Sequence, residues 1–175
     1  MLTTLFDFIL EIVAVFLGVF AAFWLDKYRE DRAERRESDR VLNLIRTEVS
    51  ANKDMLEGMK QATATAVQNV RPIRSMWEGL TNRLGLVRKD QLLSEATQLY
   101  FLLANADKML DVHQRYAGEY QFADSKRKEA MEPILQDQHK HFMSYVTTHI
   151  LPKIDRVLTL IDSELNNKQQ QNVSS

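Results

Sequence analysis

Four residues in the C-terminal half of the chain have types and spacing that could bind a metal ion. Asp137, His141, Tyr145 and His149 recur at four-residue steps, and His139 lies beside them. Two helical side chains at positions i and i+4 can coordinate one ion, so Asp137 and His141 form a conceivable pair of metal ligands. No Glu-x-x-His pair on another predicted helix would complete such a site. We therefore interpret these residues as a solvated polar face and expect no metal and no cofactor.

Glu11 is the second residue that could carry chemistry, because it interrupts an apolar run. An ionisable group inside such a helix is costly and usually faces protein or water, so Glu11 could belong to a proton or ion pathway. If the apolar core begins at Phe8, however, Glu11 lies only about 5 Å inside it and could reach the interface. A helix contact or an interfacial position is therefore favoured over conduction.

Other patterns of catalytic residues are missing from the sequence. The chain has no cysteine, no phosphate-binding Gly-rich loop and no serine nucleophile motif, which argues against thiol chemistry and nucleotide hydrolysis. His113 stands alone and is interpreted as structural or exposed. The sequence thus predicts a non-enzymatic protein with no small-molecule substrate. An aromatic group is expected in the core rather than around a ligand: Tyr100, Phe101, Tyr116, Tyr120 and Phe122.

The charge balance argues against nucleic-acid binding. The formal net charge is −1, with 23 basic and 24 acidic residues. No region has the basic surplus that attracts phosphate backbones.

The element that must position Glu11 is the apolar run from Leu5 to Leu25. A helix rises about 1.5 Å per residue, so Phe8 to Leu25 would cover about 27 Å of a hydrocarbon core roughly 30 Å thick. A soluble core helix is disfavoured because no polar residue occurs between Ile12 and Leu25. A cleaved signal peptide is disfavoured because no Lys or Arg precedes the run. We predict an uncleaved transmembrane signal-anchor over residues 5–25.

The basic residues near this segment predict its orientation. None precedes the run, and six follow it within fifteen residues, so the positive-inside rule favours a cytoplasmic C-terminal side. We expect a single-pass protein of the inner membrane, with the N-terminus outside and the bulk of the chain in the cytoplasm. The six residues are Lys27, Arg29, Arg32, Arg35, Arg36 and Arg40.

Small residues share a helical face with Glu11. Ala14, Gly18 and Ala22 form a small-xxx-small series, a pattern that lets two helices approach closely in lipid. We predict that Glu11, Ala14, Gly18 and Ala22 mediate helix packing, either in a homo-oligomer or with a membrane partner subunit. A monomeric anchor in the bilayer is the alternative.

The same segment resembles a bacterial protein family of unknown function. Its members are single-span, membrane-anchored helical proteins with an N-terminal Glu-Ile-Val…Gly…Ala…(Asn/Asp)-x-(Trp/Tyr)-x-Glu pattern. The resemblance covers about 20 residues and implies topology and architecture only. The matching residues are Glu11, Ile12, Val13, Val15, Gly18, Val19, Ala22, Leu25, Asp26, Tyr28 and Glu30.

Residues 26–40 predict a charged helical stalk. Acidic and basic residues alternate at four-residue spacing without Gly or Pro, as in Asp31 and Arg35. Each such pair stabilises a helix by a few tenths of a kcal/mol.

Residues 41–165 predict a cytoplasmic antiparallel helical bundle, because apolar residues recur at three- and four-residue steps and no segment alternates with period two. Breaks or kinks are expected at Pro72, Pro133 and Pro152. Residues 166–175 are polar and are expected to be disordered. The fold class is therefore all-α. The predicted buried stripes are Leu42, Ile45, Val49, Leu56 and Met59, then Leu92, Leu93, Ala96, Leu99, Tyr100, Leu103 and Met109, then Ile154, Val157, Leu158, Ile161 and Leu165.

Two classes of function remain from the sequence. The favoured one is a non-enzymatic, membrane-anchored scaffold or assembly subunit that presents its bundle to protein partners. The alternative is a membrane signal transducer or ion-conducting oligomer that uses the Glu11 face. An enzyme based on Asp137 and His141 is disfavoured.

Overall fold

The computed structural model describes residues 2–61, 63–64, 71–80, 87 and 90–173, and side chains from residue 13 onward, except those of 76, 80, 168, 169 and 171–173. The chain divides into two compact units, Met1–Arg40 and Val41–Ser175.

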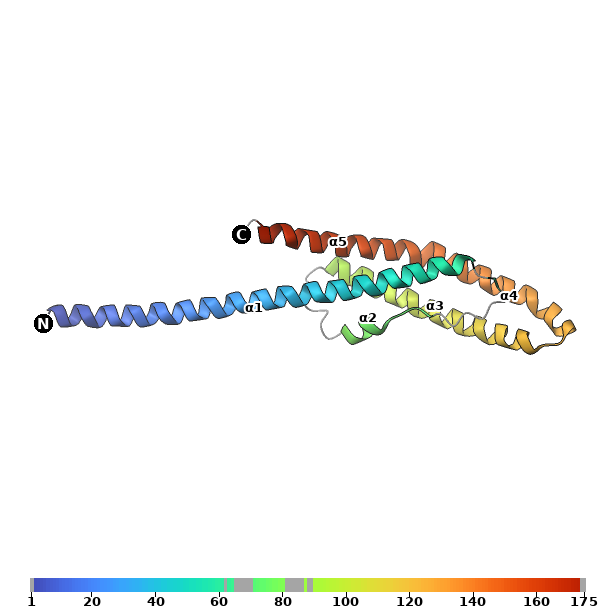
Figure 1. Cartoon of the computed structure of the whole chain (residues 1–175), viewed down its shortest axis with the longest axis horizontal. Helices are drawn as coiled ribbons and strands as arrows, with labels where there is room; N and C mark the ends of the chain where they lie inside the picture. The colour runs from blue at the N-terminus through green and yellow to red at the C-terminus, as the bar shows by residue number, and fades with distance from the viewer. Residues whose placement is uncertain (1, 62, 65–70, 81–86, 88–89, 174–175) are drawn as a thin grey trace. The chain divides into compact units, whose positions relative to one another are not determined.

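Every regular element in the described part of the chain is a helix, so the predicted all-α class is confirmed (Figure 1). Few glycines and prolines interrupt the sequence, which favours long helices. The elements are α1 (Leu2–Gly58), η1 (Met59–Gln61), α2 (Ser75–Leu80), α3 (Asp90–Phe122), α4 (Ser125–Tyr145), η3 (Val146–Ile150) and α5 (Leu151–Val173).

The first unit consists of the N-terminal part of α1. Ten large apolar or aromatic side chains of this segment are exposed, and the rings of Trp24 and Tyr28 stack one turn apart with centroids 6.2 Å from each other. The ten are Val13, Val15, Phe16, Leu17, Val19, Phe20, Phe23, Trp24, Leu25 and Tyr28.

The predicted membrane span is contradicted. In the part of the chain that the structure describes fully, no helix contains an apolar stretch long enough to cross a membrane. Of the predicted span, the side chains of residues 5–12 lie outside the described ones. The transmembrane signal-anchor over 5–25, the inner-membrane location and the orientation with a cytoplasmic bundle are corrected together.

The second unit is built around the last part of α1, residues 41–58, which packs antiparallel to α5. Arg46 Nε lies 2.9 Å from Asp162 Oδ1, and Lys53 Nζ lies 2.8 Å from Asp155 Oδ1. The two partners are seven residues apart on each helix, so one heptad of α1 matches one heptad of α5 in reverse order. The two ion pairs therefore mark the register of this antiparallel pair.

Helix α3 completes the core and runs in the same direction as the α1 segment (Figure 1). The predicted stripes are buried, with Leu93, Met109, Leu158 and Leu165 only partly so. Apolar residues at three- and four-residue steps on each helix thus meet in one core, as amphipathic patterning requires. The fully buried side chains include Leu42, Val49, Leu56, Leu99, Leu103, Ile154, Val157 and Ile161.

The carboxylate of Glu95, which is largely buried, also connects α3 to α5. Glu95 accepts from Lys153 Nζ at 2.5 Å and from Arg156 Nε at 2.7 Å, while its side chain is 15% exposed. The hydrogen bond from Lys153 lowers the pKa of the Glu95 carboxyl, because it stabilises the ionised form.

A short turn joins α3 and α4 into an antiparallel hairpin. Asp124 occupies the N-cap of α4 in an extended conformation, and its side chain accepts a hydrogen bond from the Arg127 backbone N–H at 2.8 Å. This capping satisfies one of the N–H groups that the first turn leaves without a helical partner.

The helix continues through both prolines at which breaks were expected. Pro133 lies inside α4 and is exposed, so the carbonyl deprived of its N–H partner is near solvent. Before Pro152 the helix widens into the π-turn η3, where the Leu151 N–H donates to the Val146 carbonyl. This one extra residue per turn relieves the conflict with the proline ring without ending the helix.

Helix α5 also extends further than the polar composition predicted. It includes residues 166–173 of the tail that was expected to be disordered. Gln and Lys have good helix propensity and neither Gly nor Pro occurs there, so a helix begun in the core can propagate.

The Glu95 cluster predicts an acid-sensitive bundle. A carboxyl whose pKa is lowered by folding contributes stability above its unfolded value of about 4.3, and this contribution disappears as pH falls through the folded value. We expect Glu95→Gln to lower the free energy of unfolding at pH 7 and to flatten its decline below about pH 4.3. Urea unfolding monitored by circular dichroism between pH 7 and pH 3 would measure both effects. Glu129→Gln, which alters an exposed carboxyl on α4, serves as the control. Parallel curves for wild type and Glu95→Gln would contradict this account.

Candidate functional site

Residues 71–80 form the most distinctive polar arrangement in the second unit. We call this segment the strap. Residues 71–74 have no regular secondary structure and lead into α2. Pro72 is buried and the residue before a proline favours extended backbone, so the strap begins as an extended peptide rather than as a kinked helix.

Asn52 of α1 binds the backbone of the strap at two points. Its Nδ2 donates to the Ile73 carbonyl at 2.8 Å, and its Oδ1 accepts from the Ile73 N–H at 2.7 Å. The Asn52 side chain is fully buried, so these two bonds satisfy polar groups that would otherwise be costly in the core. The side chain thus recognises an extended peptide through its main chain.

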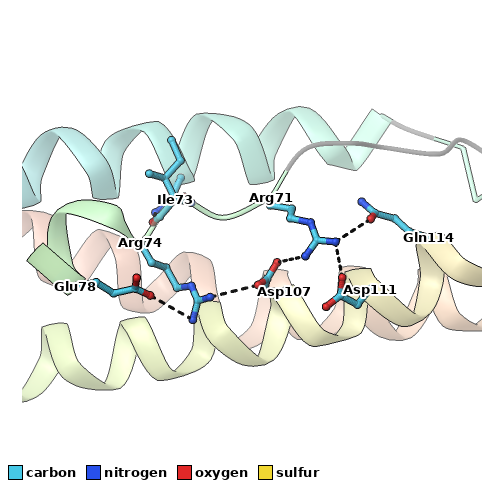
Figure 2. Close-up of polar contacts among 8 residues, drawn as sticks. Arg71, Ile73, Arg74, Glu78, Asp107, Asp111 and Gln114 are labelled. Carbon is cyan, nitrogen blue, oxygen red and sulfur yellow. Dashed lines mark hydrogen bonds and ion pairs between the residues drawn. The ribbon is translucent and has the colours of Figure 1, made fainter.

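Two arginines of the strap reach acidic residues of α3 (Figure 2). Arg71 pairs with Asp111 and, at 3.4 Å, with Asp107 Oδ1. Arg74 pairs with the second oxygen of Asp107 at 3.4 Å and with Glu78 at 3.9 Å. Figure 2 shows both guanidinium groups pointing from the strap toward α3, with Asp107 between them. One aspartate therefore serves two arginines three residues apart.

The third contact is aromatic and lies deeper. Trp77 stacks on Tyr100 of α3 with ring centroids 4.4 Å apart. The Tyr100 hydroxyl donates to Glu48 Oε1 at 2.6 Å. The backbone N–H of Trp77 donates to the same oxygen at 3.4 Å. Burial and the bond to Glu48 raise the pKa of Tyr100, so its hydroxyl stays protonated and remains a donor.

The space beneath Trp77 is too small for a ligand. It is an apolar cavity of about 10 Å³, about the size of one water probe, so it does not hold a small molecule. The neighbouring side chains are Leu42, Ile45, Val87, Leu92, Leu93, Ala96 and Ile161.

The residues predicted for helix packing in a membrane are not brought into a site. The side chain of Glu11 lies outside the described ones, while Ala14 and Ala22 are exposed on α1. A Cβ added to Gly18 would meet no atom within 4 Å. The described structure does not test their predicted role in helix packing, which stays a prediction.

Asp137 and His141 do lie together on α4, as their spacing predicted. His141 Nδ1 is 3.4 Å from Asp137 Oδ2, and both side chains are about 70% exposed. In the part of the chain that is described, no group of three or more potential ligands could hold a metal ion. The pair is thus a local contact within one helix.

His113 is buried rather than exposed. The centroid of its ring lies 6.0 Å from the ring centroid of His139 on α4. Burial lowers the pKa of His113, and electrostatic repulsion from nearby His139 lowers it further.

The predicted burial of the aromatic group is wrong except at Tyr100, which is 4% exposed. Phe101 is 66% exposed and Phe122 is 91% exposed, while Tyr116 is exposed on the same helix. Helix α3 packs on the sides that carry Asp107 and Glu95, and no helix in the described part of the chain covers its outer side.

The strap site was missed by sequence reasoning, although one signal was present. Asn52 occupies the position between Val49 and Leu56 where the apolar stripe of α1 calls for an apolar residue. A polar residue at such a position demands a buried partner. Its partner, the Ile73 backbone, lies 21 residues away and could not be identified from periodicity.

Comparison of the chain with protein-family models, with curated proteins and with solved structures finds no match. The resemblance of the N-terminal segment to a bacterial family therefore stays a prediction.

Replacing Asn52 tests whether this side chain holds the strap. Asn52→Ala leaves the Ile73 N–H and carbonyl without partners, which should cost about 1–3 kcal/mol of stability. The Ile73 amide should also lose protection in hydrogen-exchange mass spectrometry, while amides in the middle of α3 keep theirs. Asn166→Ala, on the exposed part of α5, controls for the loss of an amide. Unchanged protection at Ile73 would count against the proposed attachment.

Proposed function

We propose that this chain is a non-enzymatic helical scaffold or assembly subunit that binds protein partners through the outer face of α3. The exposed apolar residues on that face support the proposal. Exposed apolar patches with polar residues around them often mark protein–protein interaction sites. A partner surface is the simplest way to cover them.

The geometry of these residues suits a helical docking surface. Phe101 and Val112 are eleven residues apart, about three helical turns, so they lie on one line along α3. Tyr116 follows one turn later, and the exposed fractions of the three are 66%, 47% and 38%. Lys108 and Glu119 are exposed between and beyond them. Aromatic anchors surrounded by charged residues are the usual composition of a protein interface.

The architecture of the second unit supports the same proposal. Ion pairs at Glu95 fix α3 to α5, and those at Asp107 fix it to the strap. The outer face is therefore carried by a helix whose other two sides are held. A rigid surface binds with little loss of conformational entropy. Helix α3 has 33 residues and is about 50 Å long, enough to contact more than one partner segment.

Site-specific photo-crosslinking in cells tests this function. Benzoylphenylalanine placed at Phe101 or Val112 should give discrete adducts with a protein partner. The same group at Ser163, exposed on α5, is the matched control and should give none. Absence of adducts at 101 and 112, or equal adducts at 163, would contradict the proposal.

A binding measurement with the partner identified in this way makes the test quantitative. Truncating a central aromatic anchor costs at least about 2 kcal/mol, or about 30-fold in affinity. We expect Phe101→Ala to weaken binding by that amount and Ser163→Ala to leave it unchanged. Circular dichroism of both variants excludes a folding defect. Equal affinity for both variants would place the interface elsewhere.

A further inference from the structure

The strap occupies its groove in the manner of a bound peptide. Its backbone is held by Asn52 of α1, its arginines by Asp107 and Asp111 of α3, and its tryptophan by Tyr100. Main-chain bonds to an extended segment, together with charged and aromatic side-chain contacts, are how peptide-recognition grooves combine affinity with specificity.

The recognising groups all belong to α1 and α3, and the strap covers them. Asn52, Glu48 and Tyr100 are each at least 95% buried, and the side chain of Asp107 is only 18% exposed. These groups need a polar occupant, because buried amide and carboxylate groups without partners are strongly unfavourable. An apolar segment could not replace the strap.

The ion pair at Arg71 is the most solvent-exposed of the contacts that hold the strap. Arg71 is half exposed, and its partner Asp111 is exposed to a similar degree. Ion pairs in contact with water contribute little to stability. A segment held in its own chain competes through a high effective concentration rather than through strong contacts.

We propose that the groove between α1 and α3 is a recognition site for an extended partner segment with two arginines three residues apart and a tryptophan three residues further on, and that the strap fills it in the absence of that partner. The charge on Asp107 and Asp111 complements such a segment. The Arg71–Trp77 sequence, RPIRSMW, shows the spacing that fits. This site lies on a different side of α3 from the outer face, so it goes beyond the proposed function.

The experiment measures binding of a fluorescein-labelled peptide with the sequence of residues 71–80 to the full chain by fluorescence anisotropy. The variant Arg71→Ala, Arg74→Ala, Trp77→Ala weakens the strap but keeps every groove residue. It should bind the peptide about tenfold or more tightly than wild type does, because its own strap competes poorly. Adding Asp107→Asn and Asp111→Asn should weaken binding of the peptide several-fold, because it removes both carboxylates that pair with the arginines. A peptide with both arginines replaced by glutamate is the matched control and should not bind.

Three results would overturn the proposal. A folded triple variant that fails to bind the peptide would show that the strap is a permanent part of the fold. Equal affinity for the peptide with and without both aspartate substitutions would show that the groove is not the site. The third result is a wild-type dimer that forms with increasing concentration and dissociates when the peptide is added. It would show that the groove binds the strap of a second copy and not a different partner.

A second measurement applies if the triple variant does not fold. Hydrogen exchange at the Ile73 amide of the wild-type chain is followed with increasing amounts of an isotopically heavy peptide. Displacement of the strap should accelerate exchange at Ile73 several-fold and leave the amides of α5 unchanged. If a saturating peptide concentration does not accelerate hydrogen exchange at Ile73, the peptide does not displace the strap and the proposal is contradicted.

Discussion

The apolar stripe on the second half of α1 is the constraint on which the bundle depends. Leu42, Val49 and Leu56 are fully buried and recur every seven residues. A helix of this kind is not stable alone, because its stability comes from covering its apolar face. Helices α3 and α5 supply that cover, and the remaining features of the second unit follow from how they do so.

Electrostatic contacts decide the register of this packing more than its strength. The pairs Arg46–Asp162 and Lys53–Asp155 are largely exposed, and exposed pairs contribute about 0–1 kcal/mol. A shift of α5 by one residue would nevertheless separate both pairs at once while rotating its apolar stripe away from α1. The burial of Ile154, Val157 and Ile161 provides most of the stabilisation, and the charges disfavour alternative registers.

Two polar residues inside this apolar interface explain the position of the strap. Glu48 and Asn52 lie one turn apart on α1 and are 3% and 0% exposed. A bundle optimised only for stability would place apolar residues there, since buried polar groups gain little over well-packed hydrophobic ones. Both residues instead accept or donate hydrogen bonds to the strap backbone and so fix its position. The strap and the outer face of α3 thus present two separate surfaces on one rigid helix.

The sequence by itself determined the helical class and the faces that become buried. Leu42, Leu99 and Ile161 were assigned to the core from periodicity, which is a local property of the chain. The exposure of Phe101 and the pairing of Asn52 with Ile73 were decided by tertiary structure, because each depends on which helices surround a position. Hydropathy alone predicted a membrane span over residues 5–25, and the described residues contradict it. Side-chain type records what a residue prefers to contact, whereas only the packed chain determines which contacts are available to it.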